Sequence, residues 1–500
     1  MIFKWLKFGL VTRYNMQSIY RAARSDDGFG SLQGEHFMAD WTPDLTRSDK
    51  PRYLAIAELL ADDIRSGLLA PGDRLPPQRK LAAQLGVDFT TVARGYVEAQ
   101  KRGLVESKVG QGTFVLKPSR RAKAILRAPR VEPVDLSMNL PPEPDDPVLI
   151  ERMQDGLAEI GRDLLSLLRY QGFGGSQADK DAASAWLSRR SLVPSQERLF
   201  VTPGAHPALL GILTILAKPA DTILCEVLTY PGVRSIAAQL GLRLVGLPMD
   251  GDGIDPDALA QACERLKPKA LYLNPTLQNP TTLTIPEQRR AAIASVARRY
   301  GVPIVEDDAY GFIPTRKIPA FAALAPDITW HVAGLAKCIG AGLRCAYVVA
   351  PDSRSAWPFQ AALRASNVMA SPLTAALATR WIEDGTADMI LRFIRTEAAA
   401  RQMLATEILP PEGLYADPLS FNLWLGLPKP WTRSAFIGHM RATGIGIGLV
   451  ACDAFCTDGN PGEFVRVCLG GPTSRAQVRT ALDFMAHALV QPPELASTVL

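Results

Sequence analysis

From about residue 147 to the C-terminus, short apolar runs typical of strands alternate with amphipathic helical patterns. The strand-like runs include residues 199–202, 222–226, 270–274, 302–306, 329–333 and 345–350. Such alternation over several hundred residues predicts an α/β domain with a largely parallel sheet. One hydrophobic core seldom grows beyond about 250–300 residues. A chain of 500 residues is therefore expected to contain at least one further domain.

That further domain is predicted ahead of the alternating region, at residues 49–116, where the pattern is mainly helical. One helix has the apolar face Leu54, Ile56, Leu59, Leu60 and Ile64. A short helix over 77–85 and a longer one over 89–102 follow, separated by a turn at Gly86, with Asp88 as the expected N-cap of the second. Two short strands around a glycine turn come next. This order predicts a winged helix-turn-helix, with a small helical interaction domain as the alternative.

The segments outside these two domains show no clear periodicity. Residues 1–48 are predicted to be a disordered extension, and the start codon is either Met1 or Met38. Residues 117–134 are rich in Pro and Arg and are predicted to be a linker, which leaves residues 135–492 for the α/β body.

Charge and cysteine content narrow the function classes. Residues 1–130 hold 22 Lys and Arg against 13 Asp and Glu, whereas the remainder holds 33 against 37. A basic N-terminal part attached to a mildly acidic remainder indicates that the N-terminal part binds a polyanion. No apolar run has the roughly 18–20 residues of a membrane helix. The seven cysteines are dispersed without a CxxC pair, so neither a disulfide framework nor a metal site is expected, and a cytoplasmic location is predicted.

The helical front carries a long motif. The string PGDRLPPQRKLAAQLGVDFTTVARGYVEAQKRGLVESKVGQGTFV resembles the DNA-binding domain of the GntR superfamily over its whole length. The resemblance implies that double-stranded operator DNA is contacted by Arg79, Thr90, Thr91, Arg94, Lys108 and Gly112, the last two in the wing. Family members often carry Ser/Thr-Arg where this chain has Asp88-Phe89, so the operator sequence is not inferable.

Four strings in the body carry a second motif set. Strand ends lead into Gly204-Ala205-His206, into Asn279-Pro280 and into Asp307-Asp308-Ala309-Tyr310, and Lys337 is followed seven residues later by Arg344. With a late Val465-Arg466-Val467, these strings resemble the class I aminotransferases of fold type I, over roughly residues 135–490. The resemblance implies an α/β pyridoxal-phosphate-dependent transferase fold and pyridoxal 5'-phosphate as cofactor.

The same resemblance assigns roles to individual residues. Lys337 forms the Schiff base with the cofactor aldehyde, and Asp307 pairs with the ring nitrogen. Tyr310 and Asn279 hydrogen-bond the phenolic oxygen, Tyr230 stacks on the ring, and Arg466 binds the α-carboxylate of an amino compound. The phosphate is held by Arg344 and the backbone at Gly204, Ala205 and His206, with Tyr170 reaching it from a second subunit. The resemblance thus implies a homodimer, and the family suggests a head-to-tail arrangement that the sequence itself does not decide.

The chain departs from this family at the phosphate. Small hydroxyl residues are usual where it has Ala205, Gly334 and Ala336. Each missing charge-assisted hydrogen bond is expected to weaken cofactor binding by roughly 1.5–3 kcal/mol. The departure predicts reduced cofactor affinity or a site that senses the cofactor.

The GntR-type DNA-binding domain, residues 49–116, is called the reader below, and the aminotransferase-like domain, residues 135–492, is called the body. The fusion of such a reader to such a body resembles the MocR subfamily of bacterial transcription regulators. The resemblance implies a nucleoid-bound regulator of amine, amino-acid or vitamin B6 genes that responds to pyridoxal phosphate, or to its aldimine with a small amino effector. Two other functions stay open: an aminotransferase with an appended DNA-binding domain, and a cofactor-free dimeric repressor.

Overall fold

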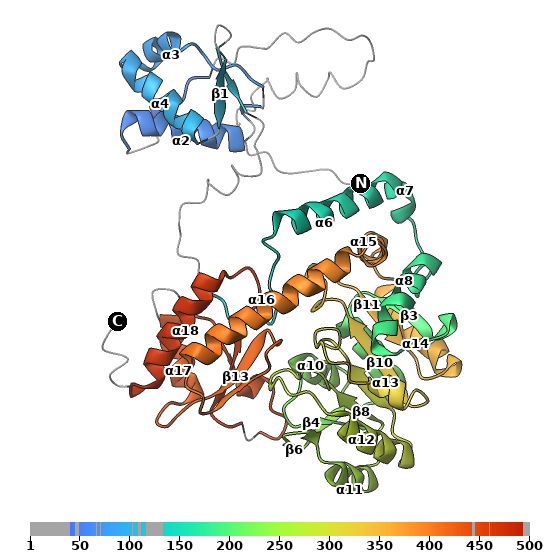
Figure 1. Cartoon of the computed structure of the whole chain (residues 1–500). Helices are drawn as coiled ribbons and strands as arrows, with labels where there is room; N and C mark the ends of the chain where they lie inside the picture. Colours follow the sequence, from blue (N-terminus) through green and yellow to red (C-terminus); the bar gives the residue numbers. More distant parts are fainter. Residues whose placement is uncertain are drawn as a thin grey trace, which may run out of the picture. The chain divides into compact units, whose positions relative to one another are not determined.

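The computed structural model describes residues 41–45, 50–66, 68–70, 72–102, 104–108, 112–116, 134–442, 446–459 and 461–493. The chain divides into two compact units, Met1–Arg130 and Val131–Leu500. Figure 1 shows the elements of each. Within these ranges, no helix has the length and apolar character needed to cross a bilayer.

The first unit is the expected winged helix-turn-helix. It contains α2 (Arg52–Arg65), α3 (Gln78–Leu85), α4 (Phe89–Lys101) and the antiparallel hairpin of β1 (Val105–Lys108) and β2 (Gly112–Val115). The side chain of Asp88 accepts a hydrogen bond from the backbone N–H of Thr90 at 2.7 Å, which confirms it as the N-cap of α4. Leu81, Val92 and Tyr96 are buried in one core with the inner face of α2.

This core begins earlier in the chain than the helical pattern does. Trp41 and Leu45 pack against the core of the first unit, although they lie inside the segment 1–48 predicted as an extension. The indole N–H of Trp41 donates to Asp63 Oδ2 at 2.7 Å, which ties the segment to α2. An isolated apolar residue carries no periodic signal, so the pattern alone does not reveal this packing. Residues 1–40 and the predicted linker up to residue 133 lie outside the described ranges.

The second unit is built on a seven-stranded mixed sheet in the order β3-β11-β10-β9-β8-β4-β5. Its strands are β3 (Leu199–Thr202), β4 (Thr222–Glu226), β5 (Arg243–Leu247), β8 (Ala270–Leu273), β9 (Ile304–Asp307), β10 (Thr329–Gly334) and β11 (Ala346–Val349). Only β11 runs antiparallel to its neighbours. The expectation of a largely parallel sheet is confirmed, and the carboxyl ends of the six parallel strands share one edge.

Helices cover both faces of this sheet. Along β3, Leu199 and Val201 belong to one apolar cluster and Phe200 to another, because successive side chains of a strand point to opposite faces. The covering helices are α8 (Gln177–Leu187), α9 (Ala205–Leu216), α10 (Pro231–Gln239), α11 (Pro256–Leu266), α12 (Glu287–Arg299), α13 (Phe321–Leu324) and α14 (Ser353–Asn367). A short ribbon of β6 (Met249–Asp250) and β7 (Gly253–Ile254) follows β5 in the chain.

A smaller sheet follows in the C-terminal part of this unit. Its order is β12 (Leu414–Ala416), β13 (Asn422–Gly426), β15 (Phe464–Cys468) and β14 (Val450–Ala451), all antiparallel. The remaining helices of the unit are α6 (Pro147–Ile160), α7 (Leu164–Leu167), α15 (Pro372–Glu383), α16 (Thr386–Ile408), α17 (Arg433–Ala442) and α18 (Arg475–Leu489). Strands β13 and β15 pack with α17 and α18 in a core of their own, which also receives Val134 and Leu136 from the start of the unit.

Candidate functional site

A cavity of about 430 Å³ lies at the edge of the large sheet where the parallel strands end. Ligand sites of open α/β sheets are found at this edge. Ten residues singled out from the sequence line the cavity together: Gly204, Ala205, His206, Tyr230, Asn279, Asp307, Tyr310, Lys337, Arg344 and Arg466. They come from segments that are far apart in the chain, and the fold brings them together around one cavity.

Asp307 and Lys337 form the buried centre of the cavity. Asp307 ends β9, and its Oδ2 accepts a hydrogen bond from the Tyr272 hydroxyl at 2.8 Å. Its Oδ1 is buried and has no hydrogen-bond partner among the described residues. Burial raises the pKa of Asp307 to about 6 and lowers the pKa of Lys337 to about 8. A lysine with a lowered pKa is more often the free amine, which is the nucleophilic form.

Asn139 belongs to the same centre, although no sequence motif singled it out. Its Nδ2 donates to the Tyr310 hydroxyl at 2.9 Å and to Asn422 Oδ1 at 3.1 Å, and its backbone carbonyl accepts from Lys337 Nζ. Asn139 follows the linker and has no motif around it. Only the tertiary fold brings it beside residues that lie far away in the chain.

Arg466 lies at one side of the cavity, on β15. Its Nη1 donates to Asn279 Oδ1 at 2.8 Å, its Nη2 donates to the carbonyl of Ser137 at 2.6 Å, and its guanidinium stacks over the ring of Phe455 at 5.0 Å. Arg466 Nε is buried without a partner in the described part of the chain. Asn279 thus orients Arg466 as well as facing the cavity.

Another part of the cavity wall is formed by the turn before α9 and by Arg344. Gly204 has φ +100°, and a Cβ built there would lie 3.2 Å from Arg344 Nη2, so the guanidinium lies close to the glycine backbone. The first N–H groups of α9 offer an anion-binding position beside it. Burial and the charge of Arg344 lower the pKa of His206, so its imidazole is neutral at pH 7. Ala205, Gly334 and Ala336 add no hydroxyl here.

Two predicted aromatic residues have different positions. Tyr230 lines the cavity, and its ring occupies the space that a side chain at Gly232 would need, since a Cβ there would lie 2.1 Å from the ring. Tyr170 is 83 % exposed and is not among the residues lining the cavity of its own chain. A role for Tyr170 in a cofactor site therefore requires the site of a second subunit.

In the first unit, the residues assigned to DNA lie on the surface around α3 and α4. Arg79 and Arg94 are exposed, Thr91 is half-buried, and Arg94 stacks over the ring of Tyr53 at 4.3 Å. The hydroxyl of Thr90 donates to Asp88 Oδ1, so Thr90 takes part in capping α4.

A basic residue that the sequence motif did not single out, Arg74, lies before α3 and pairs with Phe114 of the wing through an isolated β-bridge. A Cβ at Gly112, which has φ +114°, would lie 2.8 Å from Arg74 Nε. Arg74 is therefore packed against the glycine of the wing, where a Cβ would require its guanidinium to shift. Lys108 forms an ion pair with Glu106 at 3.0 Å on the same hairpin. The position of Arg74 at the wing was detectable only from the fold.

The chemical groups in the cavity fit pyridoxal phosphate independently of any resemblance to a family. Asp307, one of whose carboxylate oxygens is unpaired among the described residues, lines the cavity together with Lys337, and a guanidinium stands beside a helix N-terminus in its wall. These are the groups needed to hold a protonated ring nitrogen, bond an aldehyde and bind a phosphate. A second cavity, of about 730 Å³, lies between the β6–β7 ribbon and β12, and none of the predicted residues lines it.

The fold places the second unit among aminotransferases of fold type I. The α-aminoadipate aminotransferase LysN of Thermus thermophilus, solved with N-(5'-phosphopyridoxyl)-L-leucine, has a similar structure. The TM-score is 0.65 at 20% sequence identity, covering 77% of this chain and 96% of LysN. The fold predicted from the sequence is confirmed.

Family models and relatives agree with this class. Residues 52–115 match bacterial regulatory proteins of the gntR family, and residues 131–484 match aminotransferase class I and II. The chain is 28% identical to the HTH-type transcriptional regulator YdeF of Bacillus subtilis (strain 168), covering 91% of this chain and 98% of YdeF. It is 27% identical to the vitamin B6 salvage pathway transcriptional repressor PtsJ of Salmonella typhimurium, covering 76% and 86%.

The chain therefore belongs to the aminotransferase class I and II family, and its GntR-type reader gives it the MocR architecture of DNA-binding transcription regulators. The family and the fold together imply a body that binds pyridoxal phosphate.

Proposed function

We propose that this regulator responds to pyridoxal phosphate and to a small amino compound bound in the same cavity. The observation that carries the proposal is the convergence of Lys337, Asp307 and Arg344 on one buried cavity, with Asp307 Oδ1 unpaired among the described residues. When bound, the cofactor supplies an aldehyde that reacts with amines and a ring that withdraws electrons. The similarity to a repressor of vitamin B6 salvage supports the cofactor as part of the signal.

Each residue of the cavity has a role in this proposal. Lys337 provides the amine, Asp307 holds the proton at the ring nitrogen, and Tyr310 with Asn279 donates to the phenolic oxygen. Arg344 and the backbone of Gly204, Ala205 and His206 would hold the phosphate, and Tyr230 would stack on the ring. Arg466, held by Asn279, binds the carboxylate of the amino compound.

The response reaches DNA through a difference in affinity. A ligand that binds one arrangement of reader and body more tightly than another shifts the protein toward it, by no more than that difference. The reader contacts operator DNA through Arg79, Thr90, Thr91 and Arg94 and, on the wing, through Lys108 and the turn at Gly112.

We further propose a homodimer in which Tyr170 reaches the phosphate of the partner's cofactor. The exposure of Tyr170 and a run of exposed apolar side chains on and beside α6 and α7 support this arrangement. Those side chains are Val148, Leu157, Leu164, Leu165 and Leu168.

An amino-acid aminotransferase with an appended reader is the second candidate. The presence of Arg466 in the same cavity as Lys337 favours it, because a carboxylate there would place the amino group of a substrate near the lysine. Repeated turnover of an amino acid and an oxo acid would establish the enzyme. A single half-reaction without turnover would establish the sensor.

The visible absorption spectrum of the purified protein with added pyridoxal phosphate tests the proposal. The parent is expected to show the absorption band of lysine-bound cofactor, and Lys337→Ala is expected to lack it. Lys317→Ala, which changes an exposed lysine, is the matched control and should keep the band. A parent that stays colourless, while still binding operator DNA in a salt-sensitive manner, would instead indicate a cofactor-free repressor.

A further inference from the structure

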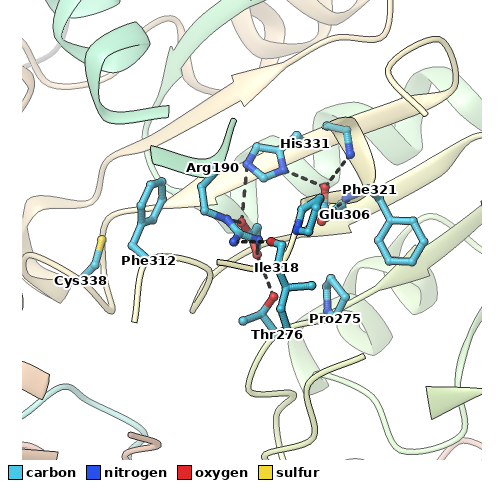
Figure 2. Close-up of polar contacts among 12 residues, drawn as sticks. Arg190, Pro275, Thr276, Glu306, Phe312, Ile318, Phe321, His331 and Cys338 are labelled. Carbon is cyan, nitrogen blue, oxygen red and sulfur yellow. Dashed lines mark hydrogen bonds and ion pairs between the residues drawn. The ribbon is translucent and has the colours of Figure 1, made fainter. Parts of the chain in front are cut away.

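A buried network of charged side chains follows Asp307 in the chain and does not line the cavity. Figure 2 shows Arg190, Glu306 and His331 of this network with their polar contacts. Asp308 follows Asp307 directly, and its side chain is fully buried in an ion pair with Arg190, which is 6 % exposed. Arg190 ends the short helix η3 (Ser188–Arg190), which follows α8. From the sequence, Asp308 had no role beyond structure and Arg190 was not singled out.

The pairing of Arg190 with Asp308 uses two guanidinium nitrogens. Arg190 Nε donates to Asp308 Oδ2 at 2.8 Å and Nη2 to Oδ1 at 3.3 Å. The remaining Nη1 donates to the carbonyl of Ile318 at 2.9 Å. The Thr276 hydroxyl also donates to Asp308 Oδ1, at 3.3 Å. Asp308 is thus held by two segments that are distant from it in sequence.

Other charged groups surround this pair. Glu306, two residues before Asp308 on β9, accepts from the N–H of Phe321 at 2.8 Å, and His331 Nδ1 on β10 lies 2.9 Å from its Oε2. His331 Nε2 lies 3.8 Å from Asp308 Oδ2, and Arg290 Nη1 on α12 lies 3.6 Å from Glu306 Oε1. Two guanidinium groups therefore offset two carboxylates, with one imidazole between them.

The network also fixes the turn that leads to Tyr310. The N–H of Asp308 donates to the carbonyl of Val332 at 2.9 Å, and the N–H of Gly311 donates to that of Asp308 at 3.2 Å. A Cβ at Gly311 would lie 2.0 Å from Asp308 Oδ2. The carboxylate of Asp308 lies so close over Gly311 that its position and the course of the turn depend on each other.

Opposing effects act on the pKa of Asp307. Burial raises this pKa, the Tyr272 hydrogen bond lowers it, and the charge of the adjacent Asp308 raises it further, whereas the charges of Lys337 and His331 lower it. Burial opposes ionisation of Asp308 as well, but Arg190 and His331 hold the pKa of Asp308 below its usual value. Asp308 is therefore ionised at neutral pH and places a negative charge beside the carboxylate of Asp307. The positive charge of Arg190 offsets part of the negative charge of Asp308 and so limits the effect of Asp308 on the pKa of Asp307.

We infer that Arg190 is a positioning residue of the cofactor site: it offsets the charge of Asp308 next to Asp307 and holds the turn that presents Tyr310. The inference rests on the proposed binding of pyridoxal phosphate. Neither Arg190 nor Asp308 lines the cavity, so both act through the residues that do.

Three variants of the full chain test the sign of this effect. Arg190→Met leaves the negative charge of Asp308 uncompensated, Asp308→Asn leaves the positive charge of Arg190 uncompensated, and the double variant leaves neither. Replacing both members of a buried ion pair by uncharged side chains of similar size is often tolerated. If Arg190→Met fails to fold, the other two variants still carry the test.

The measurements are the dissociation constant of pyridoxal phosphate, from quenching of protein fluorescence, and the pH midpoint of the visible absorption of the bound cofactor. In Arg190→Met we expect a midpoint about one unit higher and binding about tenfold weaker, because an added negative charge favours protonation and repels the phosphate. In Asp308→Asn the midpoint should move down, and in the double variant it should return close to that of the parent. Arg298→Met, which breaks the exposed Arg298–Asp327 pair, is the control and should change neither quantity.

A merely structural role predicts a different result. All three variants would then shift in the same direction, with the double variant at least as impaired as either single one, and that outcome overturns the inference. Unchanged values in all three would overturn it too. A parent that binds no pyridoxal phosphate overturns the proposed function, and this inference with it, whereas a parent that binds while the variants fail to separate by charge overturns the inference alone.

Discussion

The proposed function assigns one end of the cavity to the ring of pyridoxal phosphate and the other end to its phosphate, and these two ends are built from different groups. At the ring end, Asp307 is buried and backed by ion pairs that are themselves buried, and hydroxyl and amide groups of Tyr272, Tyr310 and Asn139 lie around it. At the phosphate end, one guanidinium and the backbone before α9 stand beside alanine and glycine residues.

This difference indicates what such a body retains. A fixed acid and lysine preserve the orientation and electronic state of the ring, on which reaction with an amine depends. Under the proposed function, fewer bonds to the phosphate would lower the affinity for the cofactor without altering that chemistry. Weaker binding would suit a protein whose occupancy must follow the concentration of its ligand.

The largest effect is expected at the ring end. Asp307→Asn removes the negative charge from a fully buried position and leaves the protonated ring nitrogen unpaired, which costs about 3–5 kcal/mol. Pyridoxal phosphate should then bind roughly a hundred- to several-thousandfold more weakly, measured by fluorescence quenching. Asp327→Asn, at an exposed ion pair, is the control, and equal affinities for the Asp307 variant and the parent would contradict the assignment.

A somewhat smaller loss is expected at the phosphate end. Arg344→Met removes the charged group beside Gly204, and two charge-assisted hydrogen bonds are worth about 3 kcal/mol together, or about a hundredfold in affinity. Pyridoxal, which lacks the phosphate, provides the control ligand. Its affinity should be the same for parent and variant, and a parallel loss would show that Arg344 acts on the fold instead.

A third variant, at the phosphate end, is expected to gain affinity for pyridoxal phosphate. Gly334→Ser has room, since a Cβ there meets only the Cβ of Ala205, at 3.6 Å. A hydroxyl directed at the phosphate should tighten binding about tenfold, as one hydrogen bond to a charged group would. Gly334→Ala supplies the same Cβ without the hydroxyl. If Gly334→Ser and Gly334→Ala have the same affinity for pyridoxal phosphate, the missing hydroxyls do not explain weak binding of the phosphate.

The smallest effect concerns pH. Because burial raises the pKa of Asp307 to about 6, this carboxyl is ionised above that pH and becomes neutral as the pH falls through it. Cofactor affinity should decrease about fourfold between pH 7 and pH 5.5, with the ionised fraction of Asp307. The matched comparison is Asp307→Asn, in which this component of the pH dependence should be absent. The same slope in both proteins would assign it to another group.

Much of the fold was readable from local pattern. The helices α3 and α4 begin and end within about a residue of their predicted limits, since Asp88 and Gly86 mark those limits by capping and turn chemistry. Six strands of the large sheet were predicted because a buried strand is a continuous apolar run, whereas the edge strand β5, which is only partly buried, was not named. The small sheet around β13 and β15 was not predicted, and neither was the packing of Trp41.

The motifs also predicted which reactive residues would lie together in the folded protein. Lys337, Asp307 and Arg344 had to lie close together if the strand ends shared one edge, and they do. The sequence by itself thus determined the elements, their order and the reactive groups, because these depend on near neighbours in the chain. The tertiary structure decided the partners of those groups. Asn139 beside Tyr310 and Arg190 beside Asp308 are contacts between distant segments, and no local pattern encodes the packing that joins them.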